Sequence, residues 1–158
     1  MSIEKVKIYF DKYNLCDKII EFSTSSATVE LAAKAIGCAD AQIAKSLTFM
    51  VNDKPIMIVT AGDAKIDNRK YKDKFETKAK MMTPDQVNLF IGHEIGGVCP
   101  FGIPSNVKVY CDISMKRFEF MYPAAGSSNS AIKLDIESLF KFSNTLEWVD
   151  ICKDWQGE

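Results

Sequence analysis

Apolar residues recur at helical spacing in the first stretch of the chain, at Ile3, Val6, Phe10 and Tyr13. A period of three to four residues places them on one face, so we predict a helix over residues 2–13. Four further helices are predicted from capping residues that precede an apolar run. They cover residues 29–36 after Thr28, 68–75 after Asp67, 84–91 after Thr83 and 136–142 after Asp135.

Period-two alternation predicts a hairpin in the middle of the chain, with strands over residues 45–51 and 55–61 joined by a turn at 52–54. Leu47, Phe49 and Val51 then share the face directed at the core, and Lys45 falls on that same face. Such a lysine either lines a pocket or extends past the strand end to solvent. The second arrangement is the commoner one, because lysine stems pack on apolar surface while the amine stays in water.

Shorter strands are predicted over residues 16–22, 107–111, 118–122, 131–134 and 146–151. Hairpins and helices follow each other without a regular β-α alternation. This order favours an α+β fold with a mixed, partly barrel-like sheet surrounded by helices over a doubly wound one. A length of 158 residues fits one domain, and we assign residues 1–158 to it.

The most unusual stretch is residues 92–104, where four of the eight glycines and two of the five prolines are found. No charged residue occurs between Ile95 and Val107. Glycine permits close approach of the backbone to another group, and proline fixes the local chain direction. The stretch is therefore either the wall of a binding site, with backbone N–H groups facing a ligand, or a tight connection packed on the core.

Composition excludes several classes of protein. The net charge of −1 argues against a dedicated nucleic-acid coat, although residues 65–80 hold seven basic and three acidic residues and form the best candidate for contacting a polyanion. Five cysteines without a C-x-x-C pair speak against a disulfide framework or zinc ribbon and are typical of reduced thiols. No stretch resembles a signal peptide or membrane span, and we expect a cytoplasmic location.

Familiar catalytic motifs are absent. Neither phosphate-binding glycine motif occurs, and no G-x-S-x-G accompanies the single histidine, His93. Cys99 lies close to His93 in sequence, but a cysteine in an apolar loop is more often a small buried hydrophobe than a nucleophile. The spacing of His93, Cys99 and Cys111 matches no standard metal site. We expect no metal and no cofactor, and assign no role to His93 or Cys99.

Four segments in order resemble the YbaK/EbsC family, the free-standing relatives of the editing domain of bacterial prolyl-tRNA synthetase. They are I-A-K-S-L from Ile43, G-D from Gly62, G-G-V-C-P-F-G from Gly96, and A-A-G from Ala124. The residues around Thr28 also resemble the N-terminal helix of that family. The matches extend over most of the chain, from about residue 22 to about residue 140.

The resemblance implies a half-closed mixed sheet and hydrolysis of the ester that joins a wrong amino acid to the 3′ end of a tRNA. It implies that Lys45 is the essential catalytic lysine and that the pocket loops around the aminoacyl group contain Gly96, Gly97, Phe101, Gly102 and Gly126. Ser46 and Ser127 offer small hydroxyl groups suited to gripping a carbonyl, a phosphate or a ribose, and we expect them to bind substrate as well. The implied substrates are cysteinyl- or alanyl-tRNA of the proline type, and prolyl-tRNA synthetase is a candidate partner.

Two other functions remain open from the sequence. The chain is alternatively a non-catalytic module of the same fold that binds a tRNA end or a synthetase, or a small-molecule binder whose glycine loop only shapes a pocket. Lys45 is expected either to bind the terminal phosphate or to stabilise the developing oxyanion. The loop backbone is expected to hold the ester carbonyl.

Overall fold

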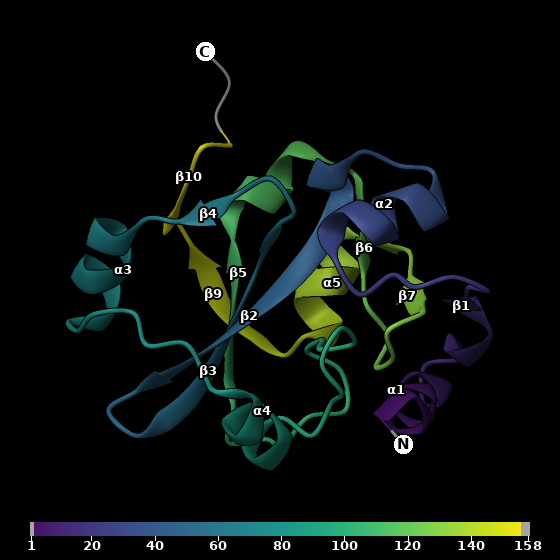
Figure 1. The fold of residues 1–158 in the computed structure, drawn as a ribbon, viewed down its shortest axis with the longest axis horizontal. Coiled ribbons are helices and arrows are strands. Elements are labelled where there is room, and N and C mark those ends of the chain that lie inside the picture. The colour runs from purple at the N-terminus through teal and green to yellow at the C-terminus, as the bar shows by residue number, and fades with distance from the viewer. Residues whose placement is uncertain (1, 156–158) are drawn as a thin grey trace.

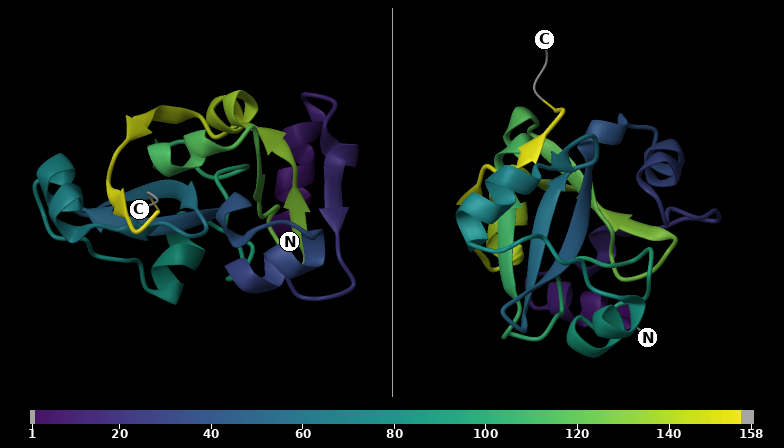
Figure 2. Two further views of the ribbon diagram at one scale, coloured as in Figure 1. Left: turned by 90° about the horizontal axis from the view of Figure 1, so that it is seen from above. Right: turned by 60° about the vertical axis from the view of Figure 1, so that its left-hand side comes forward.

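The computed structural model describes residues 2–155, and its centre is a six-stranded mixed sheet of order β8-β6-β2-β3-β5-β9 (Figure 1). Its strands are β2 (Ile43–Val51), β3 (Lys54–Ala61), β5 (Lys108–Asp112), β6 (Phe120–Pro123), β8 (Leu134–Asp135) and β9 (Thr145–Val149). The β2–β3 and β6–β8 pairs are antiparallel, whereas β2–β6, β3–β5 and β5–β9 are parallel. The sheet curls into a half-barrel (Figure 2), which confirms the predicted α+β class.

Two small antiparallel sheets complete the β-structure. One pairs β1 (Ile19–Glu21) with β7 (Ser130–Ile132), and the other pairs β4 (Lys65–Ile66) with β10 (Cys152–Lys153). The predicted strand over residues 16–22 is wrong in its first half, where a 3-10 turn, Cys16–Lys18, is found. The Lys18 N–H turns back to the Leu15 carbonyl at 2.9 Å, and the strand begins only where β7 supplies a partner.

Five α-helices lie around the sheet in the described part of the chain. They are α1 (Ser2–Asp11), α2 (Val29–Ile36), α3 (Asn68–Phe75), α4 (Pro84–Phe90) and α5 (Ile136–Phe142), and α4 and α5 lie on opposite sides of the sheet (Figure 2). The predicted caps are confirmed. Side chains of Thr28, Asp67, Thr83 and Asp135 each accept a hydrogen bond from the first turn of their helix. Gly37 ends α2 with a φ of 87°. None of the described helices has the length and apolar character needed to cross a membrane.

The predicted hairpin is confirmed, with β2 and β3 joined at Asn52 and Asp53, both at positive φ. The expected alternation of buried and exposed residues along β2 is wrong, because Thr48, Phe49 and Met50 are all buried. This strand is central and has packing on both faces, so neither set of side chains faces water. On one face, Phe49 packs against Tyr71 of α3, with ring centroids 5.1 Å apart.

One edge of β2 is paired in two separate pieces. At its start, Ile43 and Ala44 pair with β6. Near its end, the Met50 N–H donates to the Lys80 carbonyl and the Met82 N–H donates to the Thr48 carbonyl. Alternate residues of a strand direct their peptide groups to the same edge, so Ser46 faces the gap between these pieces. The next donor in the second register would be residue 84, and Pro84 has no N–H. Within residues 2–155, Ser46 has no ladder partner on that edge.

Candidate functional site

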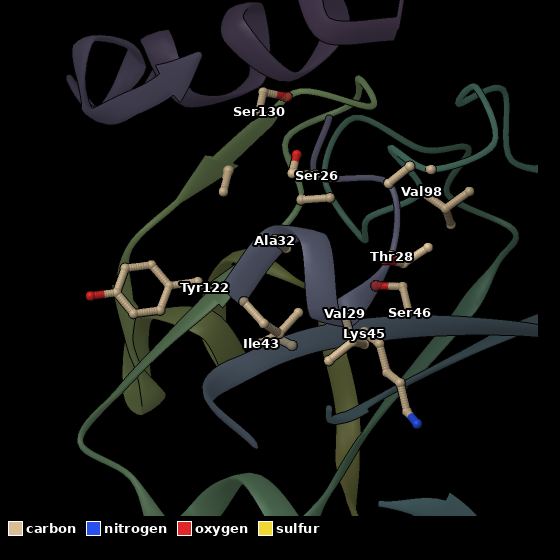
Figure 3. Close-up of a pocket in the computed structure, with 15 residues that line it drawn as sticks. Ser26, Thr28, Val29, Ala32, Ile43, Lys45, Ser46, Val98, Tyr122 and Ser130 are labelled. Carbon is tan, nitrogen blue, oxygen red and sulfur yellow. The ribbon is translucent and has the colours of Figure 1, made fainter. Parts of the chain in front are cut away.

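A cavity of about 210 Å³ lies beside this gap, where α2 begins (Figure 3). We call it the α2 cavity. Its lining comes from four segments distant in sequence; the residues are Ser26, Ala27, Thr28, Val29, Ala32, Ile43, Ala44, Lys45, Ser46, Gly96, Val98, Tyr122, Ala124, Ser130 and Ala131. Five alanines and one glycine make the lining small and mostly apolar. Three of the predicted site residues, Lys45, Ser46 and Gly96, therefore meet at one cavity.

Lys45 occupies the rim of the α2 cavity. Its side chain is half-buried, and desolvation, partly offset by the charge of Asp63, lowers the pKa of its amine below the ordinary lysine value. Figure 3 shows the stem leaving the lining and the amine pointing away from Ser26 and Ser130. The charged groups that influence it follow β3 along the chain, at Asp63 in the turn and at Lys65 in β4. The amine is thus available to a group at the mouth rather than to one deep inside.

Ser46 presents its side chain on the opposite face of β2 from Lys45, as successive strand residues must. The hydroxyl points toward the start of α2 (Figure 3). The Oγ atom is buried and has no hydrogen-bond partner among the described residues. An unpaired buried hydroxyl is costly, and it is commonly retained where a ligand supplies the partner. Ser46 therefore offers both its hydroxyl and its peptide groups to a molecule in the α2 cavity.

Ser46→Ala is expected to leave the melting temperature unchanged or slightly raised, because it removes a buried polar atom without a partner. If the hydroxyl binds the substrate, kcat/KM for deacylation falls by about five- to tenfold, the equivalent of one hydrogen bond of about 1 kcal/mol. Ser143→Ala is the matched control, because Ser143 also has a buried hydroxyl without a partner and lies outside the lining. Equal activity of the two variants would exclude a role for the Ser46 hydroxyl.

The back of the α2 cavity is formed by two loops packed directly on each other. A β-carbon added to Gly97 would lie 2.4 Å from the Ser127 nitrogen and 2.5 Å from the Gly126 carbonyl carbon. The Gly126 N–H donates to the Gly97 carbonyl at 3.0 Å, and the Gly97 N–H donates to the Glu94 carbonyl at 3.0 Å. Both amides are occupied within the protein. These two N–H groups are therefore not free to donate to an ester carbonyl, which is the role expected of the loop backbone.

The other predicted binding residues stand behind the lining rather than in it. Phe101 is fully buried against α1, with its ring centroid 4.7 Å from that of Phe10. Gly102, at a φ of 68°, brings the loop onto the Lys5 backbone. The Ser127 Oγ lies 2.6 Å from the Oγ of Ser130, which lines the cavity. In this structure Phe101 and Gly102 attach the loop to α1, and Ser127 supports a lining residue.

His93 and Cys99 approach each other, with 3.5 Å between Nε2 and Sγ, but they do not form a nucleophile–base pair. The His93 Nε2 lies 2.7 Å from the Phe101 carbonyl oxygen. A carbonyl can only accept, so this nitrogen carries the proton and cannot take one from the thiol. Burial raises the pKa of Cys99 to about 12 and lowers the pKa of His93. His93 and Cys99 therefore help to pack the glycine-rich loop, residues 92–104.

Cys99→Ala is expected to leave deacylation unchanged within about twofold and to lower stability by about 1 kcal/mol through a small cavity. The thiols can be tested directly by brief alkylation of the native protein followed by mass spectrometry. Cys16 and Cys38 are half-buried and should react, whereas the other three cysteines are buried and should not. Rapid native modification of Cys99 with loss of activity would contradict the packing role.

Several lining residues were not predicted as site residues. The sequence marks Thr28 as a helix cap and as part of the family resemblance but not as a site residue, and Ser26, Tyr122 and Ser130 carry no local signal. Tyr122 and Ser130 reach the α2 cavity because β6 and β7 fold back beside α2, a long-range arrangement. The run of small residues around Ala124 is the sequence signal for this part of the lining, because a loop of small residues lets another chain segment approach closely.

The α+β fold with its half-closed sheet and a small cavity at the start of α2 is the architecture of a domain that can hold a small chemical group. Residues 24–142 match the family described as the aminoacyl-tRNA editing domain. The chain belongs to this family, as the predicted resemblance to the YbaK type implied.

Among its relatives is the uncharacterized protein YwhH of Bacillus subtilis (strain 168), which is 50% identical over 157 residues, 99% of this chain and 100% of YwhH. The proline–tRNA ligase of Lactiplantibacillus plantarum is 27% identical over 90 residues, 56% of this chain but only 16% of the ligase. A solved structure of a candidate trans-editing enzyme for prolyl tRNA synthetase superposes with a TM-score of 0.86 at 23% identity, covering 96% of this chain and 97% of the other. The last similarity concerns the fold.

Proposed function

We propose that the protein hydrolyses the ester bond of tRNA charged with a wrong, small amino acid, and that cysteinyl- or alanyl-tRNA of the proline type is the substrate. Membership of the editing-domain family supports an aminoacyl-tRNA as the ligand. The observation that carries the proposal is the α2 cavity, which joins a lysine at its rim to a lining rich in alanine. Such a lining admits a small side chain and excludes large ones by contact.

In the proposed reaction, water adds to the carbonyl carbon of the ester and the bond to the ribose oxygen breaks. The free amino acid leaves, and the ribose oxygen takes up a proton. Among residues 2–155, the side chains that line the α2 cavity include no histidine or carboxylate, so a hydroxyl or thiol of the substrate itself is the better candidate for assisting attack. The protein contributes position, for which orientation effects of about 7–11 kcal/mol are known.

Lys45 is assigned to the phosphate that precedes the terminal ribose rather than to the developing oxyanion. Its amine points away from Ser26 and Ser130 of the α2 cavity (Figure 3). A phosphate at the mouth would also stabilise the charge on this partly desolvated amine. Ser46, through its hydroxyl and unpaired peptide groups, is then the group nearest the aminoacyl moiety.

A non-catalytic tRNA-binding module is the second candidate, and the observation that favours it is a lining of mostly small apolar residues around the α2 cavity. The two are separated by measuring both ester loss and binding of uncharged tRNA as salt is varied. Hydrolysis above the spontaneous rate supports the enzyme. Salt-sensitive binding without hydrolysis of any tested aminoacyl-tRNA would support the module, and prolyl-tRNA synthetase would then be the next partner to test.

A further inference from the structure

Two lysines face each other across the smallest sheet of the protein. Lys65 of β4 pairs directly with Lys153 of β10, and both side chains are exposed. Like charges at directly opposed positions of an antiparallel pair are destabilising, so this arrangement has a cost unless an anion joins them. Neither amine forms an ion pair with a carboxylate of residues 2–155.

The carboxylates near this pair are already engaged. Asp63 forms an ion pair with Arg117 at 2.6 Å. Asp67 accepts two backbone N–H groups at the start of α3, and Asp112 accepts those of Ser114 and Ile151, each at 2.9 Å. Asp67 also interacts electrostatically with Lys153. Neither Lys65 nor Lys153, however, has a carboxylate of residues 2–155 in direct contact with its amine.

One lysine of this pair, Lys65, lies near the rim of the α2 cavity. Lys65 lies close enough to Lys45 to disfavour the charged form of its amine. On the other side of the same turn, a β-carbon added to Gly62 would lie 2.8 Å from Val29 Cγ1, and Val29 lines the cavity. β4 follows the turn at the end of β3, and β10 lies beside β4 (Figure 1). We name Lys45, Lys65 and Lys153 the lysine cluster.

The basic stretch of residues 65–80 presents less free positive charge than its composition suggests. Lys70 and Lys74 of α3 are ion-paired with Asp150 and Glu147, at 3.0 and 2.5 Å. Part of the positive charge of residues 65–80 is therefore neutralised within the fold. The residue of this stretch nearest the rim of the α2 cavity is Lys65, which acts on Lys45 and pairs with Lys153 of the opposite strand.

We propose that Lys65 and Lys153 bind the phosphodiester groups of the RNA strand that precede its aminoacylated terminal nucleotide. This inference rests on the proposed function and extends it to the path of the 3′ end. Lys45 takes the phosphate at the mouth, and the lysine pair takes the next ones along the strand. Lysine binds phosphate as a point charge and without regard to base, so these contacts provide affinity and direction rather than sequence selection.

The test compares two substrates with the Lys65→Glu/Lys153→Glu double variant. One substrate is alanyl-tRNA of the proline type. The other is 3′-O-alanyl-adenosine, which has the same ester and ribose but no phosphodiester. We expect kcat/KM for the tRNA to fall at least tenfold and hydrolysis of alanyl-adenosine to stay within twofold of wild type. Lys54→Glu is the matched control, because Lys54 is an exposed lysine at the far end of β3.

Binding of uncharged tRNA gives a second readout that does not depend on catalysis. Removing two phosphate contacts through Lys65→Ala/Lys153→Ala should reduce the slope of log K against log salt by about 1.4, at about 0.7 per single-strand contact. An unchanged slope together with an unchanged kcat/KM for tRNA would overturn the proposal. So would an equal loss on both substrates, which would indicate a damaged fold. If the wild type hydrolyses neither substrate, the proposed function fails, and the slope alone still decides whether the pair binds RNA.

Discussion

Lys45→Met is expected to lower kcat/KM for deacylation of a small aminoacyl-tRNA by about 10–100-fold, the equivalent of one charged contact of about 1.5–3 kcal/mol to a phosphate. The variant keeps most of the apolar stem and removes only the amine. The wild-type rate should also decrease as the pH rises through the lowered pKa of Lys45, because only the protonated amine attracts a phosphate. The measurement is single-turnover ester loss between pH 6 and pH 10, corrected for spontaneous hydrolysis.

The same variant should lose activity without losing thermal stability. A lysine whose pKa is lower in the folded than in the unfolded state disfavours folding; this cost is absent above the unfolded pKa and develops as the pH falls. At neutral pH, Lys45→Met should therefore melt at the wild-type temperature or above it. Lys54→Met, at an exposed site, is the control and should match wild type in both measurements. Wild-type activity in Lys45→Met would remove Lys45 from the mechanism.

Gly97→Ala is expected to have the largest effect on the fold of the site. The added β-carbon would meet backbone atoms of Gly126 and Ser127 at 2.4–2.7 Å, and backbone cannot move aside as the end of a flexible side chain can. Overpacking of this kind costs about 1–3 kcal/mol, which corresponds to a fall in melting temperature of about 2–12 °C for a chain of this length. Deacylation should fall by more than the loss of stability alone would cause, because the two loops at the back of the α2 cavity must move apart.

The control for that variant is Gly37→Ala. Gly37 has a positive φ of 87°, so alanine is strained there, but a β-carbon would meet nothing within 4 Å. We expect a modest loss of melting temperature and full activity, because the strain is confined to the end of α2. If Gly97→Ala resembled Gly37→Ala in both stability and deacylation, the close packing of the two loops would have no importance for the site.

The parts of the fold that follow from local chemistry could be predicted from sequence. Thr28, Asp67, Thr83 and Asp135 cap their helices through atoms three or fewer residues away. The turn at Asn52 likewise follows from neighbouring residues. Such contacts do not depend on the rest of the chain, so a single sequence carries the necessary information.

The geometry of the site could not be predicted in the same way. The gap at Ser46 exists because β6 ends its pairing at Ala44 and the following register reaches Pro84, both of which depend on segments distant in sequence. Composition could not decide whether the glycine-rich loop, residues 92–104, lines a binding site or packs on the core, and in the structure it does both. Gly96 lines the α2 cavity, whereas Phe101 is packed on α1. The resemblance brought Lys45 and the loop together, but only the fold shows in which direction the Lys45 amine points.

Removal of a small amino acid from tRNA by this domain is measured most directly as ester loss from a panel of cysteinyl-, alanyl-, seryl- and prolyl-tRNA incubated with the wild-type protein. We expect hydrolysis of the cysteinyl or alanyl ester well above the spontaneous rate, and prolyl-tRNA should be left intact. Spontaneous rates for all four esters, at protein concentrations that saturate tRNA binding, would contradict the claim.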